Sequence, residues 1–168
     1  MNPAIPARAQ SDPGEFTVRA LAYGDAVVRA LEAELQQEYA ERYGGVDESP
    51  VDPSQFAPPH GVFLVGFAAA EPVASGGFCR HDDEAAEIKR MYVVEDHRGI
   101  GYARRLLAAL EARAAEAGYL RVVLETGLHQ PEAMALYESS GYRPIPGLGS
   151  YAGRPLARSF GKELLRAG

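Results

Sequence analysis

A glycine-bearing loop is the stretch of this chain whose residue types most clearly indicate chemistry. It reads Arg98, Gly99, Ile100, Gly101, Tyr102, Ala103, Arg104. A β-branched run typical of a strand precedes it, and apolar residues at helical spacing follow it. The first N–H groups of a helix have no intrahelical partner, and the helix dipole adds positive potential there. Because glycine has no Cβ, an anion can approach this backbone closely. The loop therefore predicts a phosphate site at a helix N-terminus.

The loop does not fit two common phosphate motifs. A P-loop ends in Gly-Lys-Ser/Thr, which is absent here, and a dinucleotide fingerprint needs a third glycine where this chain has Arg104. Nucleotide binding is therefore a weak interpretation. What remains is the pattern Arg98-x-x-Gly101-x-Ala103.

A second pattern follows some twenty residues later in the chain. It comprises Leu124-Glu125-Thr126 and then Gln130-x-x-Ala133-Met134-x-Leu136-Tyr137-Glu138-x-x-Gly141-Tyr142. With the loop, it resembles the two signatures of the GCN5-related N-acetyltransferases (GNAT), over about residues 60 to 145. That family usually has Asn where this chain has Gln130.

The resemblance implies acetyl-CoA as cosubstrate and no metal. The pyrophosphate would be held by amides of residues 100–104 beside Gly99, with charge-assisted contacts from Arg98 and Arg104. The strand carrying Met91 and Val93 would pair with the cofactor arm through its backbone, and the amide near Val93 would polarise the thioester carbonyl. Gln130 and Ala133 would lie along the pantetheine arm.

Three side chains are candidates for the proton transfers of acetyl transfer to an amine. Tyr137 would donate a proton to the departing thiolate, and its alternative role is packing against the sheet. Only a neutral amine attacks, so a carboxylate must remove a proton, directly or through water. Glu87 is assigned to the same strand face as Met91 and Val93 by period-two alternation. A straight strand places it ~13 Å from Met91, so Glu125 is the alternative base.

The elements that position these residues predict an α/β fold with a mixed, mostly antiparallel sheet of six to seven strands and helices on both faces. Residues 1–14 read as a loose arm and 15–168 as one domain. We expect strands at 16–21, 61–69, 72–80 and 86–94, then 120–125, 142–145 and 156–165. Helices are expected from the Asp25 cap to about Tyr43, from the loop to Ala117, and over 130–140.

Composition limits the function classes. The chain has 168 residues, a formal net charge of −6 and one cysteine, Cys79. An acidic chain is a poor candidate for nucleic-acid binding. The sequence shows neither an apolar run of the ~20 residues that a membrane helix needs nor a signal-peptide pattern, so we expect a cytoplasmic protein. The oligomeric state is open, a homodimer included.

The resemblance implies an N-acetyltransferase that moves an acetyl group from acetyl-CoA to a primary amine of a small molecule or peptide by direct attack. The alternative is an acyl-CoA-binding or sensing module of the same fold without turnover. The presence of Tyr137 and Glu87 favours the enzyme. The sequence does not identify the amine, although Tyr39 and Tyr43 are candidates for its pocket as well as for the core.

Overall fold

The computed structural model describes residues 15–46, 51–148 and 152–165. Seven strands form one sheet in the order β1-β2-β3-β4-β5-β7-β6. In chain order the strands are β1 (Phe16–Ala20), β2 (Val62–Ala68), β3 (Glu71–Arg80), β4 (Ala85–Val93), β5 (Arg121–Gly127), β6 (Arg143–Pro144) and β7 (Ala157–Glu163). β1 to β4 make an antiparallel meander, and β4 and β5 are parallel. The expected mixed, mostly antiparallel sheet is confirmed, whereas the arm proposed at residues 1–14 lies outside the described residues.

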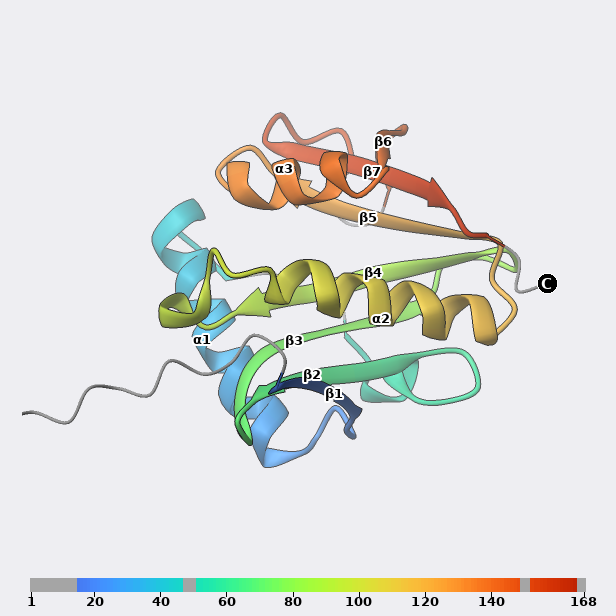
Figure 1. Cartoon of the computed structure of the whole chain (residues 1–168). Helices are drawn as coiled ribbons and strands as arrows, with labels where there is room; N and C mark the ends of the chain where they lie inside the picture. The colour runs from blue at the N-terminus through green and yellow to red at the C-terminus, as the bar shows by residue number, and fades with distance from the viewer. Residues whose placement is uncertain (1–14, 47–50, 149–151, 166–168) are drawn as a thin grey trace, which may run out of the picture.

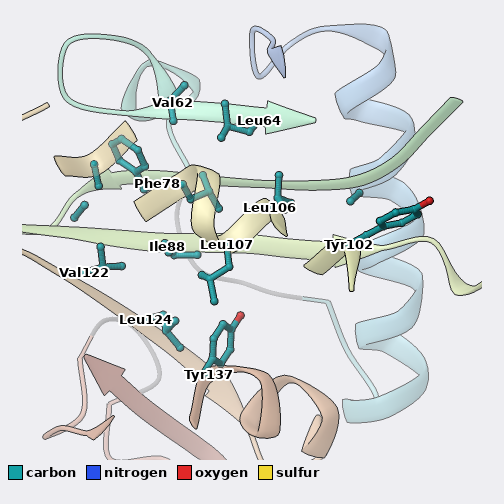
Figure 2. Packing of buried hydrophobic residues seen from close by; sticks show 14 of the residues in the cluster. Val62, Leu64, Phe78, Ile88, Tyr102, Leu106, Leu107, Val122, Leu124 and Tyr137 are labelled. Atoms are coloured by element: carbon teal, nitrogen blue, oxygen red, sulfur yellow. The ribbon is translucent and has the colours of Figure 1, made fainter. Parts of the chain in front are cut away.

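Helices cover both faces of this sheet, as expected (Figure 1). α2 (Tyr102–Glu116) and α3 (Pro131–Ser139) lie on one face, and α1 (Ala26–Tyr43) lies on the other with the short 3₁₀ turn η2 (Pro53–Phe56). Leu106, Leu107 and Leu110 of α2 are fully buried against Ile88 and Leu124 of the central strands (Figure 2). This face carries the larger apolar core, so α2 is fixed firmly over the middle of the sheet.

Local signals set the ends of α1 as the sequence predicts. The Asp25 carboxylate accepts a hydrogen bond from the Val27 N–H at 2.8 Å, which satisfies a donor that the helix leaves unpaired. At the other end, Gly44 adopts a left-handed φ of 74° and donates its N–H to the Ala40 carbonyl. Buried Val28, Leu31 and Leu35 attach the helix to the β1–β4 half of the sheet.

The two C-terminal strands are shorter than the expected ranges 142–145 and 156–165. β7 is inserted between β5 and β6, and β6 is only two residues long. The tight turn between β2 and β3 lies at Ala69 and Ala70, both with positive φ, so β3 begins at Glu71, one residue before the expected start at residue 72. Neither shift moves the central strands or α2, so the strand-loop-helix arrangement stands as expected.

An irregularity in β4 changes which side chains share a face. The register between β3 and β4 shifts at Gly76, and Arg90 has a left-handed φ of 64°. This is a β-bulge, in which an extra residue on one strand interrupts period-two alternation. Glu87 therefore lies opposite Cys79 on the α1 face, whereas Met91 packs beside Leu110 on the α2 face. The expectation that Glu87 shares a face with Met91 and Val93 is wrong.

Candidate active site

The two central parallel strands separate part-way along their length. β4 and β5 pair from Ala85 with Arg121 to Ile88 with Leu124, and no pairing follows among the described residues (Figure 1). A cleft of about 300 Å³ occupies the gap beyond these pairs. Its lining comes from both faces of the sheet, with Tyr137 on the α3 side and Tyr39 on the α1 side. A ligand in the cleft can thus extend through the sheet from one face to the other.

The glycine-bearing loop forms one end of this cleft. Gly99 and Gly101 have left-handed φ values of 79° and 91°, and the space where each Cβ would stand is open. The first intrahelical bond of α2 runs from the Arg105 N–H to the Gly101 carbonyl, so the amides of the first turn precede the hydrogen-bond ladder. The structure therefore combines unpaired helical donors with uncovered glycine backbone, which is the geometry expected for an anion site.

The two arginines that flank this loop make contacts within the protein. The Arg98 Nε donates to the Val93 carbonyl at 2.8 Å, and its guanidinium lies 2.7 Å from the Glu38 carboxylate of α1. Arg104 donates to the Ser139 and Ser140 hydroxyls at 2.7 and 3.0 Å. Both residues line the cleft. Arg98 therefore links the loop to α1 through Glu38, a role that the sequence pattern did not indicate.

Tyr137 lies at the inner part of the cleft. Its side chain comes from α3, is 5% exposed, and packs near the rings of Tyr142 and Phe160. Figure 2 shows its hydroxyl directed toward the space between β4 and β5, beneath Leu107. Burial raises the pKa of Tyr137 above the usual range for a phenol, because the phenolate would be poorly solvated. The hydroxyl therefore keeps its proton at neutral pH and is a potential proton donor.

The two candidate carboxylates are placed differently. Glu87 lies where β4 is still paired with Val123 of β5, does not line the cleft, and approaches Lys89 and His81 at 3.7 and 3.9 Å. Glu125 follows Leu124, the last residue of β5 that pairs with β4, and lines the cleft. The Ser159 hydroxyl lies 3.4 Å from its carboxylate. The geometry favours Glu125 over Glu87 as the group nearer the cleft.

Comparison with known proteins decides the family. The family model described as the acetyltransferase (GNAT) family matches residues 23–142. The IAA acetyltransferase of Azospirillum brasilense is 33% identical over 141 residues, covering 83% of this chain and 92% of that protein. The chain belongs to the GNAT family.

Solved structures agree with this assignment. One is a protein from Klebsiella pneumoniae that carries a provisional name as an acyl-CoA N-acyltransferase. It superposes with a TM-score of 0.76 at 32% identity, covering 89% of this chain and 98% of that one. A GNAT family acetyltransferase from Elizabethkingia anophelis, solved with acetyl-CoA bound, has a TM-score of 0.66 at 18% identity, with coverage of 89% and 99%. The second likeness concerns the fold alone.

Other residues that the GNAT resemblance singles out also border the cleft. Met91 and Val93 lie on the separated part of β4, and Gln130 and Ala133 lie at the start of α3. The amide oxygen of Gln130 accepts a hydrogen bond from the Tyr43 hydroxyl at 3.2 Å. The structure thus brings the predicted cofactor residues of this GNAT chain around one cleft, with the exception of the exposed Ile100, while Glu87 also stays outside it.

Sequence reasoning named Tyr39 of α1 as a candidate for the pocket of this GNAT protein, and Tyr39 lines the cleft, but it missed Glu38 of the same helix. Glu38 lines the cleft and carries contacts to Arg98 and Arg42. The only sequence signal was the spacing of Glu38 and Arg42, which places opposite charges on one helix face. Such a pair usually indicates a solvated surface, so it did not mark Glu38 as part of the site.

Within the described residues, no helix is both long and apolar enough to span a membrane.

Proposed function

We propose that this GNAT chain is an acetyl-CoA-dependent N-acetyltransferase that acetylates a primary amine of a small molecule or peptide. The observation that carries the proposal is the separation of β4 from β5 directly beside the uncovered glycine loop. This arrangement offers helix N-terminal amides for a phosphate and, along the cleft, two described strand segments that no longer pair with each other. A buried tyrosine hydroxyl lies where the two strands separate.

The chain's residues fit an acyl-CoA on physical grounds. A Cβ at Gly99 or Gly101 would meet only open space, so the loop backbone is accessible to a pyrophosphate. Arg104 lies at the same end and adds positive charge. Acetyl-CoA would supply the activated acetyl group as a thioester. Beyond Ile88 the described residues of β4 no longer pair with β5, so the backbone there can pair with the extended pantetheine arm, except at the Val93 carbonyl, which accepts a hydrogen bond from Arg98.

The proposed chemistry needs one proton removed and one supplied. The nitrogen of a neutral amine attacks the thioester carbonyl, a C–N bond forms, and the C–S bond breaks. Glu125, on the cleft, accepts the amine proton directly or through water. Tyr137 donates its hydroxyl proton to the leaving sulfur as the thiolate forms and regains a proton from water. Its raised pKa keeps the hydroxyl protonated beforehand, although it also makes the phenol a weaker acid. No acyl-enzyme is involved.

Amine-dependent thiol release from acetyl-CoA tests the proposal. The purified chain would be screened with polyamines, amino acids, peptides, aminoglycosides and the compound IAA for which the Azospirillum relative is named. We expect stoichiometric release of CoA thiol and an acetylated amine, detected by mass spectrometry. Calorimetric binding of CoA with no turnover on any amine would instead support an acyl-CoA-sensing module. No CoA binding would overturn both functions.

A further inference from the structure

A set of contacts between α1 and the start of α3 joins the two halves of the sheet beyond the point where β4 and β5 separate. α1 is anchored on the β1–β4 half of the sheet, and α3 packs on the β5 half. The last turn of α1 nevertheless contacts the segment before α3, although β4 and β5 no longer pair there. These contacts, called here the α1–α3 bridge, join Arg42 and Tyr43 to His129, Gln130 and Glu132.

The bridge has several independent contacts. Arg42 donates to the His129 carbonyl at 2.9 Å and forms an ion pair with Glu132. The His129 imidazole lies 2.8 Å from the Arg42 carbonyl and stacks on the Tyr43 ring at 4.9 Å between centroids. Gly127 lies so close that a Cβ there would be 2.1 Å from the Tyr43 hydroxyl. This packing sets how far α1 stands from the β5 half of the cleft.

One carboxylate connects this bridge to the glycine-bearing loop. The same Glu38 oxygen lies 2.7 Å from the Arg98 guanidinium and 3.6 Å from that of Arg42. The side chains of Glu38 and Arg42 are only 21% and 24% exposed, so solvent screens the group less than an ordinary surface pair. Arg98 is further fixed by its bond to the Val93 carbonyl and lies over the Tyr92 ring. A continuous chain of charges thus runs Arg98, Glu38, Arg42, Glu132.

We propose that Glu38 is a positioning residue that makes the order of the α1–α3 bridge depend on the cofactor loop. CoA at residues 98–104 would restrict the loop and hence Arg98. Arg98 would hold Glu38, and Glu38 would hold Arg42 in its contact with Glu132. The α1 side of the cleft, which carries the amine-pocket candidate Tyr39, is then shaped when the cofactor is bound. This inference rests on the proposed function, because it requires CoA at the loop.

Hydrogen–deuterium exchange with CoA as the probe tests the proposal without a known amine. Each protein is measured alone and with CoA at a saturating concentration set by calorimetry. Differences in CoA affinity between variants then do not change the fraction of protein that has CoA bound. In the wild type, we expect CoA to slow exchange at least ~3-fold in residues 98–104 and also in 38–44 and 127–132, because ordering raises the free energy of local opening.

Variants test whether the Glu38 carboxylate carries the CoA-dependent slowing of exchange from the loop to the α1–α3 bridge. Glu38→Ala should confine the CoA-dependent slowing to residues 98–104. Glu41→Ala is the matched control, since it removes an exposed carboxylate from the same helix and should behave as the wild type. Arg42→Gln should keep the slowing at 98–104 and lose it at 127–132. Alanine favours helix, so α1 should persist in the alanine variants, as circular dichroism would show.

The outcomes are separable. CoA binding with no slowing outside 98–104 in the wild type would overturn the role of Glu38 and leave the proposed function intact. Unchanged slowing at 127–132 in Glu38→Ala would overturn it as well. Failure of the wild type to bind CoA would overturn both this inference and the proposed function.

Discussion

Glu87 and Met91 lie on opposite faces of β4, because the left-handed backbone at Arg90 inserts an extra residue between them. Glu87 is directed with Cys79 toward the α1 face, and Met91 packs with α2 beside the cleft. The bulge also directs Arg90 toward Glu32 of α1, where the two form an ion pair at 3.2 Å. The bulge thus separates Glu87 from Met91 and Val93, and of the two predicted bases only Glu125 lines the cleft.

Replacing Gly101 tests the loop. Gly101→Asp places a Cβ and a negative charge at an anion site, so we expect CoA to bind at least tenfold more weakly, a loss of ~1.4 kcal/mol or more in calorimetric titration. Gly101→Ala should weaken binding less, because it adds backbone strain without charge. Gly118→Ala is the control, since Gly118 has a similar φ of 97° at the opposite end of α2. Equal CoA affinity in all four proteins would exclude the loop as the phosphate site.

Tyr137→Phe tests the proton donor. The ring and its packing are kept, so CoA affinity should be nearly unchanged, while kcat should fall by ~10²–10⁴-fold if the hydroxyl acts as a general acid. Tyr142→Phe is a matched control, because its ring lies 5.7 Å from that of Tyr137 while its hydroxyl bonds to Glu111 instead. A decrease in kcat of less than about twofold for Tyr137→Phe would assign that residue to packing alone.

The general base is tested by the pH dependence of kcat/KM. An unperturbed primary amine has a pKa of ~10.4, so without a base in the site kcat/KM would rise only as pH approaches that value. A base within the site lets kcat/KM rise at a lower pH. In Glu125→Gln we expect this rise to shift toward the pKa of the amine. Glu87→Gln should retain the wild-type profile, because Glu87 lies outside the cleft. If the two variants exchange these behaviours, Glu87 is the base, and if neither shifts, solvent deprotonates the amine.

Cys79 should be unreactive in the folded chain. Burial raises the pKa of its thiol to about 11, and the nearby Glu87 carboxylate adds to the shift. Since the thiolate is the reactive form, at pH 8 only ~10⁻³ of the folded thiol is ionised, against roughly a quarter of a free thiol with pKa ~8.5. We expect alkylation at pH 8 to be slower than in denaturant by two or more orders of magnitude. Comparable rates would show that Cys79 is accessible and normally ionised.

The local parts of the fold and site could be predicted from the sequence. The Asp25 cap, the Gly44 end of α1 and the strand-loop-helix at residues 86–117 depend on neighbouring residues, so their signals are present in short stretches. The two GNAT signatures likewise indicated the loop, Gln130 and Tyr137 before their arrangement was known. The antiparallel meander followed from short connections between successive strands.

Only the tertiary structure decided which of these residues meet. The bulge at Arg90 is a pairing irregularity between two strands, and no signal in β4 itself reveals it, so alternation misplaced Glu87. The contacts from Glu38 to Arg98 and from Arg42 to Glu132 join residues far apart in the chain, and their geometry depends on how α1 packs on the sheet. Local propensity specifies the elements of this protein, whereas strand register and long-range packing place the charges around its cleft.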